Sequence, residues 1–291
     1  MPGSNRLLIK VTRDSLPKQR DRYPFLYLER GRLEVDGSSV KWIDSGGDVI
    51  PIPVATVASL LLGPGCTVTH EAVKTASSAN CVLAWVGEDS LLFYAAGYIP
   101  TADTRNFLRQ VELRSHPDKT AAVARSLFSR RFPKADIEGK STQEIMGMEG
   151  YRVRALYEAK ANEYQVGWSG RRFEPGKFEL GDTTNKILTS SNAALYAILS
   201  SIIHSLGYSP YIGFIHSGSP LPFVYDLADL YKDELCIDLA FSLTRTMAGR
   251  YNRDIVIDSF RERVQSMLLM EKVPEDIQKI MWGSRGRRAS Q

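Results

Sequence analysis

Cysteine is scarce in this sequence, and its three copies stand far apart in the chain. They are Cys66, Cys81 and Cys236. An odd number of widely spaced cysteines matches neither a disulfide framework nor a zinc knuckle. We therefore expect three reduced thiols in the core, which is the usual place of a free cysteine.

Long apolar runs and nucleotide-binding loops are also missing. No apolar run reaches the roughly 18 residues that span a bilayer, and the beginning, MPGSNRLLIKVTRD, has an apolar segment too short for a signal peptide. The glycines in GPG and SGG indicate turns, because neither stands in a phosphate-cradling or Rossmann pattern. We expect a cytoplasmic protein with no membrane partner.

A strong charge of either sign is absent as well. The net charge is +4, so charge alone does not indicate nucleic-acid binding. The distribution of charge is more informative, because the charged side chains of residues 105–134 are mostly basic. These are Arg109, Arg114, Lys119, Arg125, Arg130 and Arg131, against Glu112 and Asp118. A solvated helix face explains this segment as well as a nucleic-acid surface does.

The first third of the chain has the pattern of β-strands. FLYLERGRLEVDGSSVKWID alternates apolar and polar residues between turns at DGSS and SGGD. The two prolines of VIPIPVATVASLLLGPG favour an edge strand over a central one. THEAVKTASSAN predicts a short helix, and CVLAWVG and LLFYAAG predict two further strands.

From about residue 100 the apolar period changes to that of helices. The longest apolar stripe follows Asp182, a helix-capping residue type, and ends at Gly207. Further helices are expected near residues 223–235, 238–248 and 254–272. We divide the chain into a β-rich domain at 1–95, a linker at 96–105, a helical domain at 106–283 and a basic, disordered tail at 284–291.

A histidine and two aspartates stand close together in GFIHSGSPLPFVYDLADLYK, residues 213–232. His216 is expected to end an apolar strand at a Gly/Ser turn, where functional groups are often presented. Asp226 and Asp229 are three residues apart on the following helix and so share a face, which Asp233 extends by one turn. Two interpretations stay open: a solvated acidic face balanced by Lys232, or a site with a cation between the carboxylates.

Such a site suits Mg²⁺ or Mn²⁺, because these ions prefer oxygen ligands and Mn²⁺ accepts imidazole. It is a poor zinc site, since no cysteine joins it. A third carboxylate is needed, and Glu149 in GMEGYRVR is the best candidate. The alternative for Glu149 is a simple ion pair with Arg152 at the start of a helix.

Several stretches of this sequence together resemble one known family. They are GMEGYRVRALY, WSGRRFEPGKFELGDTTN, ALYAIL, GYSPYIGFIHSGSPLPFVYDLADLYK, PGCTVTHEAV and VLAWVGE. The sequence resembles the CRISPR-associated integrase of spacer acquisition, the universal adaptation endonuclease, of the type I-E kind. The resemblance covers roughly residues 20 to 270, and the order and spacing of the glutamate, the histidine and the paired aspartates make it specific.

The resemblance implies an α+β fold and a set of site residues. An N-terminal β-sandwich-like domain, with dimerisation and partner contacts, would precede an all-α catalytic domain. Glu149, His216 and Asp229 would hold Mg²⁺ or Mn²⁺, and Asp226 would support the site as a further catalytic residue. DNA binding is assigned to Arg125, Arg131, Arg154, Arg171, Arg172, Tyr196, Tyr225 and Lys232.

The resemblance also implies partners and a reaction. The partners would be double-stranded DNA (prespacer and CRISPR leader–repeat), a second copy of this chain in a homodimer, and a small ferredoxin-like protein that completes a heterohexamer. A prespacer 3′-hydroxyl would attack a phosphodiester of the array, with nuclease and disintegrase capability. Two other functions stay open: a metal-dependent structure-specific nuclease in repair, and a non-catalytic DNA-binding scaffold with a structural salt-bridge face.

Overall fold

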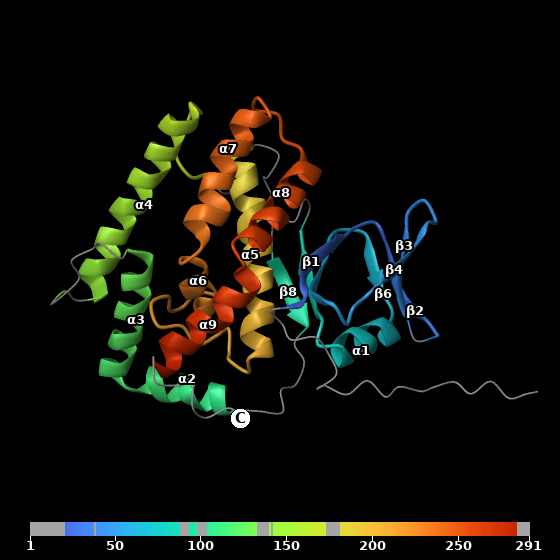
Figure 1. Ribbon diagram of the computed structural model, residues 1–291, viewed down its shortest axis with the longest axis horizontal. Coiled ribbons are helices and arrows are strands. Elements are labelled where there is room, and N and C mark those ends of the chain that lie inside the picture. Colours follow the sequence, from blue (N-terminus) through green and yellow to red (C-terminus); the bar gives the residue numbers. More distant parts are fainter. Residues whose placement is uncertain are drawn as a thin grey trace, which may run out of the picture.

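The structure is a computed structural model that describes residues 21–37, 39–87, 93–97, 104–132, 140, 142–172 and 181–283. The predicted tail at 284–291 and residues 98–103 of the predicted linker lie outside these residues. Strands occupy one end of the molecule and helices α2 to α9 occupy the other (Figure 1). The exact domain boundaries stay a prediction.

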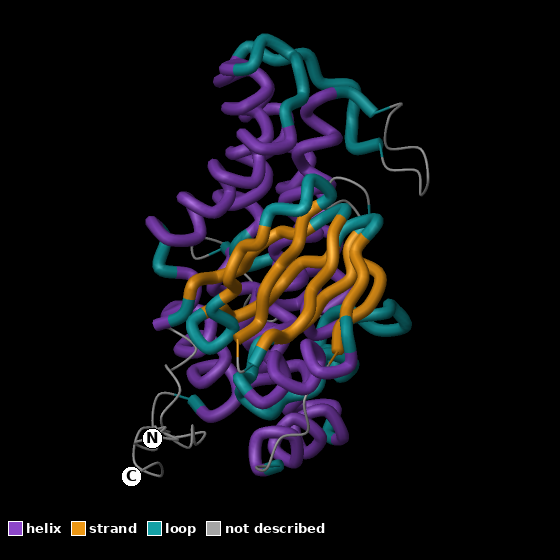
Figure 2. Tube along the Cα trace, turned by 90° about the vertical axis from the view of Figure 1, so that its right-hand side faces the viewer, coloured by secondary structure: helices purple, strands orange, loops and turns teal. Residues whose placement is uncertain are grey.

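Two four-stranded sheets form the β part, whose strands lie in front of the helices in Figure 2. One sheet has the order β1 (Tyr23–Leu28), β5 (Val57–Leu62), β7 (Val82–Val86) and β8 (Phe93–Gly97). The other has the order β4 (Val49–Ile52), β3 (Ser39–Asp44), β2 (Gly31–Asp36) and β6 (Cys66–Val68). The expected edge position of the proline-containing strand is confirmed, since Pro51 lies in β4 at the end of its sheet.

Strand β5 is buried on both faces and joins two cores. Leu60 and Leu62 pack with Trp42 in a small core that includes residues of both sheets. Leu61, on the opposite face, belongs to the large core of the helical part. A nearly continuous apolar run such as VASLLL is typical of a strand covered on both faces, and its one polar residue, Ser59, donates its hydroxyl hydrogen to the carbonyl of Pro24. The short helix α1 (His70–Ser78) packs beside β2 and β7.

Helix α5 (Thr183–Ser205) is the centre of the helical part and touches both the sheet and its neighbouring helices. The Asp182 carboxylate caps it by accepting the backbone N–H of Asn185 at 2.8 Å, as expected from the sequence. By length and composition α5 could cross a membrane, but 83% of its apolar window is buried inside the protein. Its apolarity is that of a core helix covered on all sides.

The other helices pack on α5 or on the helices next to it. They are α2 (Arg105–Ser115), α3 (Pro117–Arg131), α4 (Thr142–Tyr164), α6 (Pro222–Ala228), the π-helix η5 (Asp233–Asp238), α7 (Leu239–Thr246), α8 (Arg253–Ser266) and α9 (Leu269–Trp282). Helices α3 and α4 lie on the side of the bundle away from the sheets (Figure 1).

The predicted α+β class, with the β part first, is confirmed. Two helix predictions are wrong in detail. The segment near 223–235 is a short helix and the start of a π-helix, separated by a turn. The segment near 254–272 is broken at Leu268, whose φ of 52° is left-handed and interrupts the regular helix.

Candidate functional site

The predicted acidic residues and the histidine converge from three separate segments. Glu149 comes from α4, His216 from the loop between α5 and α6, and Asp226 from α6. Asp229 immediately follows the last residue of α6 and ends that helix. The side chains of Glu149 and Asp229 are 16% and 17% exposed to solvent, so the site is recessed but reachable. We call Glu149, His216 and Asp229 the donor triad.

The loop before His216 is not the strand that the sequence predicted. Residues 213–216 have no regular structure, so their backbone N–H groups find no partners in a sheet ladder. The Asp226 carboxylate replaces that ladder, because it accepts the backbone N–H groups of Phe214, Ile215 and His216. The Asp226 side chain is 0% exposed. The interpretation of a solvated acidic face is therefore wrong for this residue.

Asp226 also orients the imidazole ring of His216. Its Oδ1 lies 2.8 Å from Nδ1, and because a carboxylate only accepts, Nδ1 carries the hydrogen. In the neutral ring the lone pair is then on Nε2, which faces Asp229 Oδ2 at 3.7 Å. The hydrogen bond to Asp226 raises the pKa of His216, while burial lowers it by less.

Arg131, the last residue of α3, pairs with the acidic residues of the site. Its Nη1 contacts Glu149 Oε1 and lies 3.3 Å from Asp229 Oδ2, and its Nη2 lies 3.7 Å from Asp233 Oδ1. The alternative of a Glu149–Arg152 pair is therefore wrong, because Arg131 is the partner. Burial raises the pKa of Glu149, although Arg131 opposes this.

Lys232 and two tyrosines form the opposite wall of the site. Lys232 Nζ contacts Asp229 Oδ1 at 2.9 Å and lies 5.1 Å from the centre of the Tyr196 ring. The Tyr196 and Tyr225 rings meet edge to face at 5.1 Å, and Tyr225 meets His216 at 5.9 Å. The three residues assigned to DNA binding therefore also shape the surroundings of His216 and Asp229.

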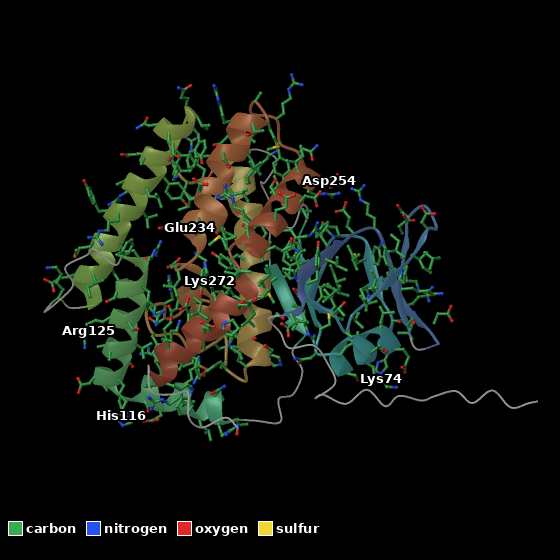
Figure 3. All side chains as sticks on the ribbon, viewed as in Figure 1. Lys74, His116, Arg125, Glu234, Asp254 and Lys272 are labelled. Carbon is green, nitrogen blue, oxygen red and sulfur yellow. The ribbon has the colours of Figure 1, made fainter. Side chains whose placement is uncertain are left out.

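The remaining basic residues assigned to DNA binding lie apart from the donor triad. Arg125 is exposed on α3, on the side opposite the β part (Figure 3). Arg154 is exposed on α4, about 140° around the helix from Glu149. Arg171 holds the segment after α4 against α5 through Asn185 and Thr189. Arg172 is exposed beside it. Their assignment to DNA stays a prediction.

The chemistry of the donor triad fits a divalent ion. Two carboxylates and one imidazole nitrogen, with the second nitrogen held by a buried aspartate, are a ligand set for Mn²⁺ or Mg²⁺. Among the described residues, no three His, Cys, Asp or Glu side chains stand close enough to hold an ion in the present arrangement. In this arrangement the Arg131 guanidinium contacts the two carboxylates of the triad.

Two residues near the site were missed by the sequence prediction. Asp233 was treated as an extension of the acidic stripe, yet it contacts Arg131. Gln110 of α2 is fully buried and donates to the carbonyls of Ser209 and Ile212, upstream of His216. No local pattern could reveal Gln110, because its partners are about a hundred residues away in sequence.

The sequence and its fold match known proteins. Residues 129–276 match the family described as CRISPR associated protein Cas1. A protein of Chlorobaculum tepidum named CRISPR-associated endonuclease Cas1 2 is 60% identical over 276 residues, which cover 95% of this chain and 93% of that protein. This chain belongs to the CRISPR-associated Cas1 family. The resemblance seen in the sequence is confirmed.

Two solved structures extend this comparison. A structure titled "Crystal structure of TtCas1-DNA complex" has a TM-score of 0.66 and 35% identity, and the match covers 92% of this chain and 100% of that chain. Another, titled "Casposase bound to integration product", has a TM-score of 0.67 and 17% identity, with 92% and 96% covered. At that identity the second likeness shows a shared fold alone.

Proposed function

We propose that this member of the Cas1 family is a divalent-metal-dependent DNA integrase that inserts short prespacer DNA into a CRISPR array. The observation that carries the proposal is the donor triad, with Glu149, His216 and Asp229 brought together from separate segments. Support comes from the relative named as an endonuclease and from the DNA complex of a protein 35% identical to this one. The casposase structure supports the fold alone.

The proposed reaction is a transesterification. A prespacer 3′-hydroxyl attacks a phosphodiester at the repeat boundary, one P–O bond forms, another breaks, and a DNA 3′-hydroxyl leaves. No covalent enzyme intermediate is required, so the protein has to position the reacting groups and neutralise charge. Mg²⁺ or Mn²⁺ held by the triad would polarise the phosphoryl oxygen and lower the pKa of the attacking or leaving oxygen.

The residues around the triad have distinct roles in this proposal. Asp226 keeps the hydrogen on Nδ1 of His216, so that Nε2 is free to act as a ligand. Lys232 neutralises part of the charge of Asp229 and stays protonated, because Asp229 and Tyr196 raise its pKa against the opposing effect of burial. Exposed Arg125 and Arg154 would contact phosphates of the bound duplex.

The proposed assembly follows from family membership. The substrates would be a double-stranded prespacer and the leader–repeat DNA. The chain would form a homodimer, and two such dimers would join a dimer of a small ferredoxin-like adaptation protein. Because the chain is only mildly basic, the other subunits would supply part of the contacts to a long duplex.

A second candidate is a metal-dependent nuclease acting in repair. The donor triad could activate water in place of a DNA hydroxyl, and the Chlorobaculum relative is named as an endonuclease. The scaffold alternative is less favoured, because a structural salt-bridge face does not require the buried Asp226 to lock one tautomer of His216.

The deciding experiment is a joining assay with the full chain and its small adaptation partner. An oligonucleotide duplex with 3′-hydroxyl ends is incubated with supercoiled array plasmid and Mg²⁺ or Mn²⁺, and a duplex with 3′-dideoxy ends is the matched control. We expect covalent joining of the first duplex alone, lost with chelator or in Glu149→Gln. Cleavage without joining would favour the nuclease, and an active Glu149→Gln would overturn the metal assignment.

A further inference from the structure

Arg131 is the more enclosed of the two cations that contact the carboxylates of the site, since the Lys232 side chain is 20% exposed. The Arg131 side chain is only 6% exposed, and its two terminal nitrogens contact Glu149, Asp229 and Asp233. Burying a guanidinium is costly unless carboxylates surround it, and the same holds for carboxylates without a cation. Three mutually repelling carboxylates therefore share this one guanidinium as a partner.

The atoms that Arg131 contacts are the atoms that an ion would need. Nη1 contacts Glu149 Oε1 and Asp229 Oδ2. Asp229 Oδ2 is also the oxygen that faces Nε2 of His216, at 3.7 Å. One guanidinium nitrogen thus contacts the two oxygens that converge with the free imidazole nitrogen. A divalent ion and this nitrogen would repel each other strongly at such distances.

The present contacts of Arg131 are also incomplete. Within the described part of the chain, Arg131 Nε is buried without a hydrogen-bond partner, and so is Asp233 Oδ1. A guanidinium has five N–H donors, and a well-built structural ion pair uses them more fully. The guanidinium also lies over an aromatic ring, since the centre of the Phe132 ring is 5.2 Å from the Arg131 guanidinium carbon.

We propose that Arg131 is an internal cation that neutralises the donor triad before the ion binds and must release Glu149 and Asp229 when it does. This inference rests on the proposed metal site. Arg131 then acts as a positioning residue: it keeps the carboxylates together in the metal-free protein and lowers the affinity for the ion by competing with it. Asp233 keeps part of the guanidinium charge paired after release.

The test is Mn²⁺ binding to the full chain without DNA, measured from the electron paramagnetic resonance of free Mn²⁺. Arg131→Met keeps most of the side-chain length and removes the cation, so we expect binding about tenfold tighter than in the wild type, within the usual range for competing sites. Arg131→Lys should stay near the wild type. Arg152→Met is the matched control, because Arg152 stacks on the same Phe132 ring at 5.0 Å.

The outcomes separate the two proposals. Tighter binding in Arg131→Met with little change in Arg152→Met supports competition at the triad. If Arg131→Met binds Mn²⁺ as tightly as the wild type or more weakly, the inference is overturned and the metal assignment stands. Equal tightening in both variants also overturns it, since general charge removal would then explain the effect. Absence of Mn²⁺ binding in every variant overturns the metal assignment together with the inference.

A second measurement follows the wild-type chain itself, and a variant serves only to assign the signal. The Nε–H signal of Arg131 is followed by NMR in ¹⁵N-arginine-labelled protein and is assigned by its loss in Arg131→Lys. We expect the signal to shift and its exchange with water to become faster as Mg²⁺ is added. An Arg131 signal that stays unchanged at saturating Mg²⁺ would show that the guanidinium keeps its partners, and would overturn the inference.

Discussion

The carboxylate of Asp226 binds His216 twice. Its Oδ1 accepts the backbone N–H of His216 at 2.8 Å and the ring Nδ1–H at 2.8 Å. A single buried oxygen therefore holds both the backbone and the imidazole ring of His216. Asp226 and His216 are adjacent in the site, but their loss should have different consequences.

His216→Ala should abolish DNA joining with little loss of stability, because the ring is 33% exposed and its removal opens no closed cavity. Asp226→Asn should reduce both the joining rate and the stability, since an amide nitrogen would then face backbone N–H donors. A lost hydrogen bond to a buried charged group costs about 1.5–3 kcal/mol. Urea unfolding and the joining assay, run on the same two variants, check this. Near-normal joining by His216→Ala with added Mn²⁺ would rule out its role as a ligand.

Asp229→Asn should lower the joining rate more than Asp233→Asn. Both carboxylates contact Arg131, at 3.3 and 3.7 Å, so both substitutions remove one partner of that guanidinium. Only Asp229 also faces His216 and can act as a ligand beside it. The comparison therefore separates metal ligation from pairing with Arg131. Equal residual joining rates in the two variants would contradict the donor triad.

Arg154→Ala should weaken binding to duplex DNA of any sequence. If Arg154 contacts one phosphate, the slope of log K against log[salt] should become shallower by about 0.9. Glu149→Gln is the contrasting variant, because it should lose joining but keep its DNA affinity and salt slope, or bind slightly more tightly. Salt-dependent fluorescence anisotropy with a labelled duplex measures both. An unchanged slope in Arg154→Ala would remove it from the DNA surface.

Asp238 should stabilise the helical part in a pH-dependent way. Its carboxylate forms ion pairs with Lys160 and Arg263, each at 2.7 Å, and accepts a hydrogen bond from the Tyr164 hydroxyl at 2.9 Å. These contacts link η5 to α4 and α8. Burial alone would raise the pKa of Asp238, but these partners outweigh it and lower the pKa. Because the folded pKa is below the unfolded value of about 3.9, the stabilisation is present above that pH and is lost as the pH falls below it.

Asp238→Asn should therefore lower the free energy of unfolding at pH 7, by about 1–3 kcal/mol. The difference from the wild type should shrink towards zero as the pH is lowered through 4 to the folded pKa. Urea unfolding at several pH values measures it. Asp258→Asn is the control, since Asp258 is 66% exposed and has a single i,i+3 pair with Arg261. A difference that does not vary with pH would contradict the ionic explanation.

Local sequence patterns were sufficient for much of the fold. Alternation and turn residues located β2 and β3, and the capping aspartate and apolar stripe located α5. The strand predicted to end at His216 was wrong for an identifiable reason. A short apolar run is compatible with a strand or with a buried loop, and here the buried Asp226 supplies the partners that a neighbouring strand would have supplied.

The sequence by itself determined the chemical types in the site, because the glutamate, the histidine and the paired aspartates stand in a specific order that resembles one family. Tertiary structure alone decided the pairing. It placed Arg131, from the end of α3, against Glu149 of α4 and Asp229 after α6, and so excluded the alternative in which Glu149 pairs with Arg152. Local helix periodicity describes neighbours within one helix, whereas these contacts depend on how three separate elements are arranged in space, which no short stretch of sequence specifies.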